Sequence, residues 1–162
     1  EEIINGMNQI RKVAEKIHSR RKELNIPVRQ PLQKLIAFSP KDEKIWEFGK
    51  DVLSEEINVK EIEFKWYEEV EKDEDLKKCF NDGFYLDTNI TPELKEEADT
   101  RDLIRKIQAA RKELGVEMNA KVNLSTNWMP KTKELKDWLL TKTLVNEVSE
   151  GEFGVSLVNA KN

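Results

Sequence analysis

The chain has little of the residue types on which most metal sites and many catalytic sites depend. Its 162 residues include one cysteine, Cys79, and one histidine, His18. These two side chains exclude an internal disulfide and a zinc site built from Cys and His. We interpret Cys79 as a small buried hydrophobe beside Phe80, and His18 as a packing or surface residue at the edge of an apolar helix face.

Long apolar runs and glycine-rich motifs are absent as well. No run approaches the roughly 20 apolar residues of a membrane-spanning helix, and no basic segment followed by an apolar stretch opens the sequence. The six glycines are scattered, so no phosphate-binding loop and no Gly-x-Ser-x-Gly nucleophile motif is present. Because 37% of the residues are charged, neighbouring carboxylates are expected on solvated helix faces rather than in acid–base pairs. We predict no catalytic residue, metal site or cofactor in this chain.

Charge is distributed unevenly, although the total is small. The chain has 28 Lys and Arg against 32 Asp and Glu, a net charge of −4, which at first argues against a nucleic-acid binder. Residues 11–34, however, hold eight Lys and Arg against two Glu, a net charge of +6, and residues 101–121 hold six against three acidic residues, a net charge of +3. Residues 42–75 carry −9. Two interpretations stay open: one continuous basic face for nucleic acid, or ordinary solvated polar faces.

Apolar spacing and cap residues predict the elements of the first half. Apolar residues recur at helical spacing from Ile3 to Leu24, and Asn25 and Pro27 favour an end to this helix. Ser39 and Pro40 are typical of the start of a second helix. The predicted elements are a helix at 3–25, a strand at 31–38, a helix from 40 with Ile45, Phe48, Val52 and Leu53 inward, and a half-buried strand at 58–64 with Ile62 and Phe64 inward.

The same signals continue along the rest of the chain. Residues 68–75 are acidic and are predicted to form a solvated turn, and Asn81-Asp82-Gly83 predicts a tight hairpin turn. Thr91-Pro92 predicts a helix start and Gly115 its end. The predicted elements are hairpin strands at 76–80 and 84–86, a helix at 91–114 burying Leu94, Ala98, Ile104, Ile107 and Leu114, a strand at 121–125, a helix at 133–145 with Trp138 in the core, and a strand at 153–158.

The two halves repeat at an offset of 90 residues. Arg21-Lys22-Glu23-Leu24 matches Arg111-Lys112-Glu113-Leu114, and Asn25 matches Gly115, the two residue types that accept a left-handed C-cap. We therefore predict an α+β fold of two duplicated helix-strand-helix-strand units about a pseudo-twofold axis, with a connecting hairpin. The predicted parts are 1–25 and 26–75 for the first repeat, 76–90 for the hairpin, and 91–162 for the second repeat.

Four segments, in order, resemble the C-terminal region of isoleucyl-tRNA synthetase. They are Arg20–Leu32, Ile57–Phe64, Leu86–Glu97 and Arg101–Lys112, within a resemblance that spans residues 10–125. The resemblance implies that residues 1–25 are the last helix of the anticodon-binding bundle and that the rest is a C-terminal extension. Ala98-Asp99-Thr100 departs from the Gly-Leu-Ala usual in the family. With Cys79 alone, the sequence is similar to the zinc-free, eukaryote-like type.

The resemblance implies an accessory tRNA-binding domain of an isoleucine–tRNA ligase. Its partners would be tRNA(Ile) and the remainder of a longer synthetase chain, which would supply catalysis with ATP and Mg in the cytoplasm. A start at Glu1-Glu2-Ile3, already inside an amphipathic pattern, agrees with a longer parent. Arg and Lys would position tRNA phosphates, and an amide could read a base edge. The predicted tRNA-binding residues are Arg20, Arg21, Lys22, Arg29, Gln30, Arg101, Arg105 and Arg111.

Alternatives remain at this point for both the residues and the domain. Arg21 and Arg111 have helical spacing to glutamates and can be explained as ion pairs without any tRNA contact. Trp66 and Trp128 stand at strand ends, where they are either edge-packing residues or platforms for unpaired bases. The domain as a whole has a second interpretation, a structural or protein-interaction module that braces the synthetase, with protein partners bound through its acidic face.

Overall fold

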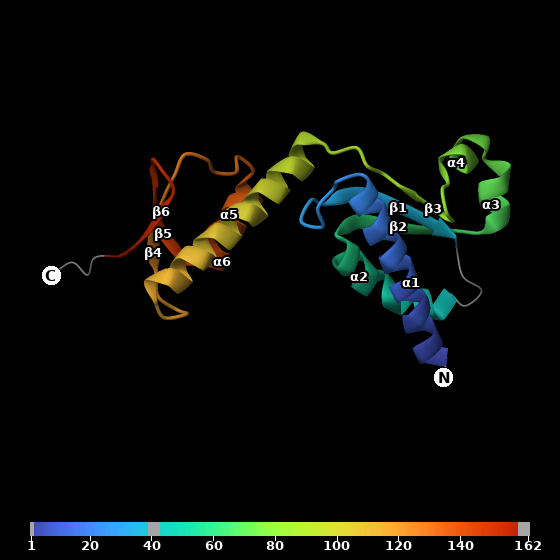
Figure 1. Ribbon diagram of the computed structural model, residues 1–162, viewed down its shortest axis with the longest axis horizontal. Coiled ribbons are helices and arrows are strands. Elements are labelled where there is room, and N and C mark those ends of the chain that lie inside the picture. The colour runs from blue at the N-terminus through green and yellow to red at the C-terminus, as the bar shows by residue number, and fades with distance from the viewer. Residues whose placement is uncertain (1, 39–42, 159–162) are drawn as a thin grey trace. The chain divides into compact units, whose positions relative to one another are not determined.

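A computed structural model describes the backbone of residues 2–38 and 43–158, and the side chains of residues 6–38 and 49–158. The fold is mixed α+β, as predicted, and it divides into two compact units: unit 1, residues 1–94, and unit 2, residues 95–162. Each unit has a three-stranded sheet accompanied by helices (Figure 1). The division falls just inside helix α5 (Pro92–Leu114). The predicted cap at Ser39-Pro40 lies outside the described residues.

Unit 1 is built on the central strand β1 (Leu32–Phe38). Strand β2 (Val59–Lys65) pairs with it in parallel, and β3 (Phe84–Leu86) pairs with its other edge in antiparallel. A parallel pair requires a crossover connection, which helix α2 (Glu43–Ile57) supplies. The remaining elements are α1 (Glu2–Glu23), which precedes β1, and the short helices α3 (Tyr67–Lys72) and α4 (Glu74–Cys79) between β2 and β3.

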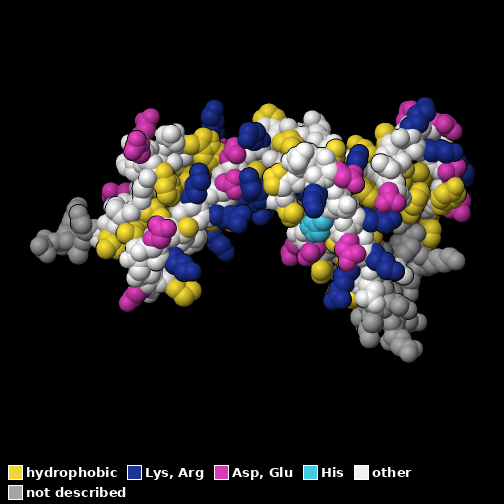
Figure 2. All heavy atoms as spheres, viewed as in Figure 1, with side chains coloured by type: hydrophobic (Ala, Val, Ile, Leu, Met, Phe, Trp, Pro, Cys, Tyr) yellow, Lys and Arg dark blue, Asp and Glu magenta, His cyan; other side chains and the backbone are white. Residues whose placement is uncertain are grey.

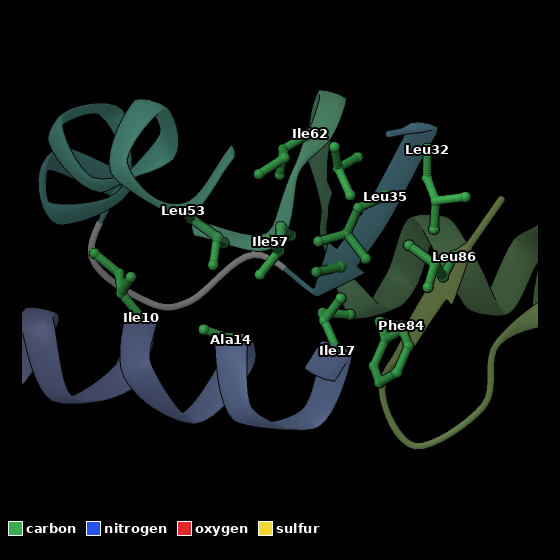
Figure 3. Packing of buried hydrophobic residues seen from close by; sticks show 12 residues of the cluster. Ile10, Ala14, Ile17, Leu32, Leu35, Leu53, Ile57, Ile62, Phe84 and Leu86 are labelled. Atoms are coloured by element: carbon green, nitrogen blue, oxygen red, sulfur yellow. The ribbon is translucent and has the colours of Figure 1, made fainter. Parts of the chain in front are cut away.

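The core of unit 1 lies between α1, α2 and one face of the sheet. Helix α1 presents Ile10, Ala14 and Ile17 at spacings of four and three residues, and these side chains point toward the strands (Figure 3). Leu35 is paired with Ile62 on one side and Leu86 on the other, so one row of apolar side chains crosses the sheet. All of these residues are buried. The predicted apolar face of the first helix is therefore confirmed from Ile10 to Ile17.

Unit 2 repeats this topology with different lengths. Strand β4 (Val122–Thr126) is central, β5 (Val145–Glu150) pairs with it in parallel, and β6 (Gly154–Leu157) pairs in antiparallel. Helix α5 precedes β4, and α6 (Lys133–Thr143) forms the crossover. The repeat predicted from the 90-residue offset is thus one topology built twice. The pseudo-twofold relation between the units stays a prediction.

Left-handed residues end the helices at equivalent places in the two units. Asn25 and Gly115 follow the first helix of each unit with φ of 55° and 64°, as predicted. Asn58 and Leu144 follow the crossover helix with φ of 51° and 55°. Leucine is a costly residue in this conformation, so its presence at 144 shows how strongly the surrounding unit determines the turn.

Two predictions for the middle of the chain are wrong. Residues 76–79 belong to helix α4, not to a strand, because the Asp73 carboxylate caps that helix by accepting from the Leu76 amide at 2.9 Å. The acidic segment begins as helix α3, not a turn, and the Glu69 carboxylate accepts from the Trp66 amide at 2.6 Å. The tight turn is confirmed, since Asp82 and Gly83 have φ of 56° and 91°.

Several burial predictions also need correction. Val52, Leu114, Cys79 and Trp138 are exposed, so the predicted place of Trp138 in the core is wrong. Strand β5 was not predicted at all, since the helix was expected to reach 145; it ends at Thr143. Leu53, Ile62, Leu94, Ala98, Ile104 and Ile107 are buried as predicted, Phe64 is half-buried, and the side chains of Ile45 and Phe48 lie outside the described residues.

Candidate nucleic-acid interface

Arg21, predicted to contact tRNA, is buried at the C-terminal end of α1. Its Nη1 donates to the carbonyl oxygens of Pro27 and Gln30 at 3.2 and 2.9 Å. Its Nη2 donates to those of Ile57 and Asn58 at 2.8 and 3.0 Å. The side chain is 1% exposed, and burial lowers the pKa of the guanidinium to about 10. Arg21 therefore ties the end of α1, the loop that follows it and the end of α2 together.

Arg111 makes the equivalent set of contacts in unit 2. Its Nη1 donates to the carbonyl oxygens of Ala120 and Thr143 at 2.7 and 3.2 Å. Its Nη2 donates to those of Glu117 and Met118 at 3.1 and 3.2 Å. Three of the four acceptors are equivalent to those of Arg21 in the repeat. Glu117 corresponds to Pro27, Ala120 to Gln30, and Thr143 to Ile57. We call each arrangement an arginine clamp: Arg21 with residues 27–30 and 57–58, and Arg111 with residues 117–120 and 143.

Three of the side chains predicted to contact tRNA are engaged by groups of their own units. Arg21 and Arg111 turn inward and their terminal nitrogens are occupied by carbonyl oxygens, so neither is placed to bind a phosphate. The glutamate pairing considered as an alternative is not seen either. Gln30 is 7% exposed, and its Nε2 donates to the carbonyl oxygens of Pro31 and Leu94, both at 3.0 Å. Its amide is therefore engaged within unit 1 and is not placed to read a base.

Two further predicted residues form ion pairs within their own helices. Arg20 Nη1 lies 3.0 Å from Glu23 Oε2. Arg101 Nη2 lies 3.1 Å from Glu97 Oε1, and its guanidinium carbon lies 5.4 Å from the centre of the Trp138 ring. Both arginines remain partly exposed. A phosphate contact from either one competes with a glutamate already in place.

Lys22, Arg29 and Arg105 are the predicted residues that the structure leaves exposed. Lys22 lies in the last turn of α1, Arg29 in the loop held by the Arg21 clamp, and Arg105 in the middle of α5. Figure 2 shows Lys and Arg side chains together with Asp and Glu side chains along α5, and a similar mixture over α3 and α4. Other exposed basic residues on the first helices are Arg11, Lys12, Lys16, Lys106 and Lys112.

Part of the positive charge of residues 11–34 is neutralised by strand β2. Lys34 Nζ lies 3.3 Å from Glu61 Oε1 and 2.7 Å from Glu63 Oε2, and Lys65 Nζ lies 3.0 Å from Glu63 Oε1. The hydrogen bonds that Lys34 donates to Glu63 and Glu61 raise the pKa of Lys34, and those that Glu63 accepts from Lys34 and Lys65 lower the pKa of Glu63. The exposed positive charge of residues 11–34 therefore lies on α1 and the loop that follows it.

A second glutamate, Glu96, links two elements of unit 2. Its carboxylate accepts from the Lys131 amide, from the Thr132 amide at 2.9 Å and from Thr132 Oγ1 at 2.8 Å, at the start of α6. These hydrogen bonds lower the pKa of Glu96. The carboxylate supplies a tertiary cap for α6, whose own cap residue makes no side-chain hydrogen bond to its helix.

The comparison with known proteins points to one enzyme class. No protein-family model matches the chain. Over 74 residues the chain is 38% identical to the isoleucine–tRNA ligase of Clostridium kluyveri, a match that covers 43% of the chain and 7% of that protein. The chain is related to isoleucine–tRNA ligase. The match covers only a small part of that relative, so it does not show that this chain has the activity of the whole enzyme.

Within the described side chains, no three His, Cys, Asp or Glu residues are grouped so that they could hold a metal ion. None of the helices described is long and apolar enough to cross a membrane.

The arginine clamps were not predicted from the sequence, although the repeated Arg-Lys-Glu-Leu was a signal for them. A pair of equivalent pockets that line up at the same 90-residue offset was not predicted either.

Proposed function

We propose that this chain is an accessory C-terminal domain of an isoleucine–tRNA ligase and that it helps hold the anticodon end of tRNA(Ile). The relation to isoleucine–tRNA ligase carries the proposal. The exposed Lys22, Arg29 and Arg105 support it, because such residues provide the sequence-independent contacts that position an RNA backbone. ATP-dependent aminoacylation would take place elsewhere in the parent enzyme, in the cytoplasm, and this chain would supply affinity and orientation.

The arginine clamps support this role indirectly. The Arg21 clamp fixes the conformation of residues 27–30, which include Arg29, relative to the last turn of α1, which includes Lys22. Basic side chains mounted on a fixed backbone lose less conformational freedom on binding than those on a mobile loop. We therefore assign Arg21 a positioning role in unit 1, with the phosphate contacts made by its exposed neighbours.

Binding of tRNA(Ile) transcript to the 162-residue chain at several salt concentrations tests the proposal. Changing Lys22, Arg29 and Arg105 to Glu should weaken binding and should lower the slope of log affinity against log salt by about one unit for each phosphate that is no longer neutralised. Lys78→Glu, a single charge reversal on the exposed surface of α4, is the control for a change outside the basic helices and should leave the slope unchanged. Equal affinity and equal slope for the triple variant and the unaltered chain would contradict a tRNA-binding role.

The surface of α3 favours a second candidate, a module that braces the synthetase or binds another protein. Trp66 and Tyr67 are 42% and 59% exposed beside the exposed carboxylates of Glu68 and Glu69. Exposed aromatic side chains are enriched at protein interfaces. Under this hypothesis Tyr67→Ala should lower the thermal stability of the parent enzyme, while the triple charge variant should retain full tRNA affinity. The opposite pair of results supports tRNA binding and rules out bracing through this surface.

A further inference from the structure

The repeat builds a pocket at the same place in each unit. In unit 1 a pocket of about 340 Å³ lies between α1, the end of β1 and the turn before β3. In unit 2 a pocket of about 260 Å³ lies between α5, the end of β4 and the segment before β6. Six lining positions correspond at the 90-residue offset. The pairs are Gln9 with Asp99, Lys12 with Asp102, Val13 with Leu103, Lys16 with Lys106, Ala37 with Asn127, and Phe38 with Trp128.

Two properties of this pocket are common to both units. An aromatic side chain lies at the end of the central strand, Phe38 as the last residue of β1 in unit 1 and Trp128 two residues beyond β4 in unit 2. A lysine of the first helix lines the pocket, Lys16 of α1 in unit 1 and Lys106 of α5 in unit 2. A flat apolar surface beside an ammonium group suits a ligand with an aromatic ring and a negative charge.

The two pockets differ in the sign of their charge. The lining of the unit 1 pocket carries Lys12, Lys16 and Asp82, a net charge of +1. The lining of the unit 2 pocket carries Asp99, Asp102 and Lys106, a net charge of −1. Lys12 and Lys16 are four residues apart and therefore lie on one face of α1, where both can face one anion. Of these two pockets, the one in unit 1 combines an aromatic surface with an excess of positive charge.

The geometry around Phe38 fits a planar ring. Phe38 is half-buried and is held by Phe80 and Tyr67, with ring centres 4.8 and 5.6 Å away. Gly83 has no side chain, and a Cβ there would lie 3.7 Å from the Phe38 ring. Lys16 Nζ donates to the Asp82 carbonyl oxygen at 3.2 Å and lies 3.5 Å from Asp82 Oδ1, which holds the turn against α1. The aromatic surface is thus fixed before any ligand arrives. A phosphate at Lys16 shares this lysine with the Asp82 carboxylate, whereas Lys12 supplies the second positive charge.

We infer that the unit 1 pocket binds one unstacked nucleotide of a single-stranded RNA segment, with its phosphate at Lys12 and Lys16 and its base against Phe38. The inference rests on the proposed function, because the anticodon loop of a tRNA supplies such a segment. Stacking of one base on an aromatic side chain and pairing of one phosphate with lysines are the two ordinary components of single-stranded RNA binding. The volume suits one nucleotide and is too small for a folded partner.

Titration of the 162-residue chain with hexauridylate, monitored by amide NMR shifts, tests this site. The amides of Val13, Ala37 and Phe84 should shift together. Lys12→Asp, which installs the residue of the unit 2 pocket, should weaken the affinity derived from these shifts at least tenfold. Phe38→Leu, which keeps an apolar side chain in the pocket, should weaken it about 5- to 150-fold if stacking carries the binding. Thermal melts of both variants show whether they remain folded, and Lys12 is exposed, so its variant should melt like the unaltered chain.

Asp102→Lys is the matched control, since it changes the net charge by the same amount in the opposite direction and outside the unit 1 pocket. It should leave the affinity derived from unit 1 amides unchanged; an equal and opposite change would mean that net charge alone governs binding and would overturn the site. Inorganic phosphate that shifts the same amides with equal affinity would also overturn it. Binding of tRNA(Ile) without any response of these amides would refute the pocket and leave the proposed function intact, whereas no tRNA binding at all would refute the proposed function.

Discussion

Replacing Arg21 with methionine removes four hydrogen bonds from the clamp while keeping a long apolar side chain in its place. The carbonyl oxygens of Gln30 and Ile57 are buried, and each would lose a charged donor. A buried acceptor left without a partner costs about 1–3 kcal/mol. Methionine also relieves the desolvation of the guanidinium, which is visible in the lowered pKa of Arg21, and this offsets part of the loss. We expect a net loss of about 2–4 kcal/mol in the free energy of unfolding.

Urea unfolding followed by circular dichroism measures this loss, since the midpoint should fall while the slope is maintained. Lys22→Met is the matched control: the same substitution at the next residue, on the exposed side of the helix, should change the free energy of unfolding by less than about 0.5 kcal/mol. Arg21→Lys should fall between the two, because one ammonium group cannot reach four carbonyl oxygens on two segments. If Arg21→Met and Lys22→Met unfold at the same urea concentration, the clamp does not stabilise unit 1.

Three further predictions concern both units. Arg111→Met should destabilise the chain by a similar amount, about 2–4 kcal/mol, against a Lys112→Met control, and a change confined to either clamp would contradict their equivalence. The pKa of Glu96 is lowered in the folded state, so its contribution to stability is present above the unfolded pKa and is lost as the pH falls through the folded pKa. The difference in unfolding free energy between the unaltered chain and Glu96→Gln should therefore be largest near neutral pH and vanish in strong acid; a pH-independent difference would show that the carboxylate charge is irrelevant. Gly49→Ala should destabilise by about 1–3 kcal/mol, although alanine favours helices, because its Cβ would overlap Ile10 Cδ1, and a higher urea midpoint would show that Ile10 moves aside without cost.

Helix ends were predictable because the cause is local. Asn25 and Gly115 are suited to a left-handed turn whatever surrounds them, and both adopt it. Short helices were not predictable in this way. The acidic residues of α3 and α4 suggested a solvated turn, whereas Glu69 and Asp73 act as capping groups that stabilise the two helices. Strand β5 was missed because almost all of its side chains are exposed, so its sequence shows no alternation between apolar and polar residues.

The candidate site shows the same limit for individual side chains. From the sequence, every arginine in a basic helix is predicted to lie on the surface, because buried charged side chains are rare. Arg21 and Lys22 are adjacent in sequence, but Arg21 is buried and Lys22 is exposed. The position of the helix against the loop decides which of the two is buried. The paired pockets depend on contacts between α1, β1 and the turn before β3, which are far apart in the chain. Their correspondence at the 90-residue offset becomes visible only after the structure identifies the lining residues.

Each arginine clamp holds its loop through main-chain carbonyl oxygens. These contacts do not depend on which side chains the loop carries. Residues 26–30 read Ile-Pro-Val-Arg-Gln and residues 116–120 read Val-Glu-Met-Asn-Ala, with no identity at any of the five positions. The two arginines nevertheless donate to equivalent carbonyl groups in both loops. One unit therefore has the basic residue Arg29 in this loop and the other has Asn119 at the matching position, on equivalent main-chain contacts. The clamp therefore fixes the backbone conformation of the loop, whereas the side chains that the loop exposes are set by its sequence.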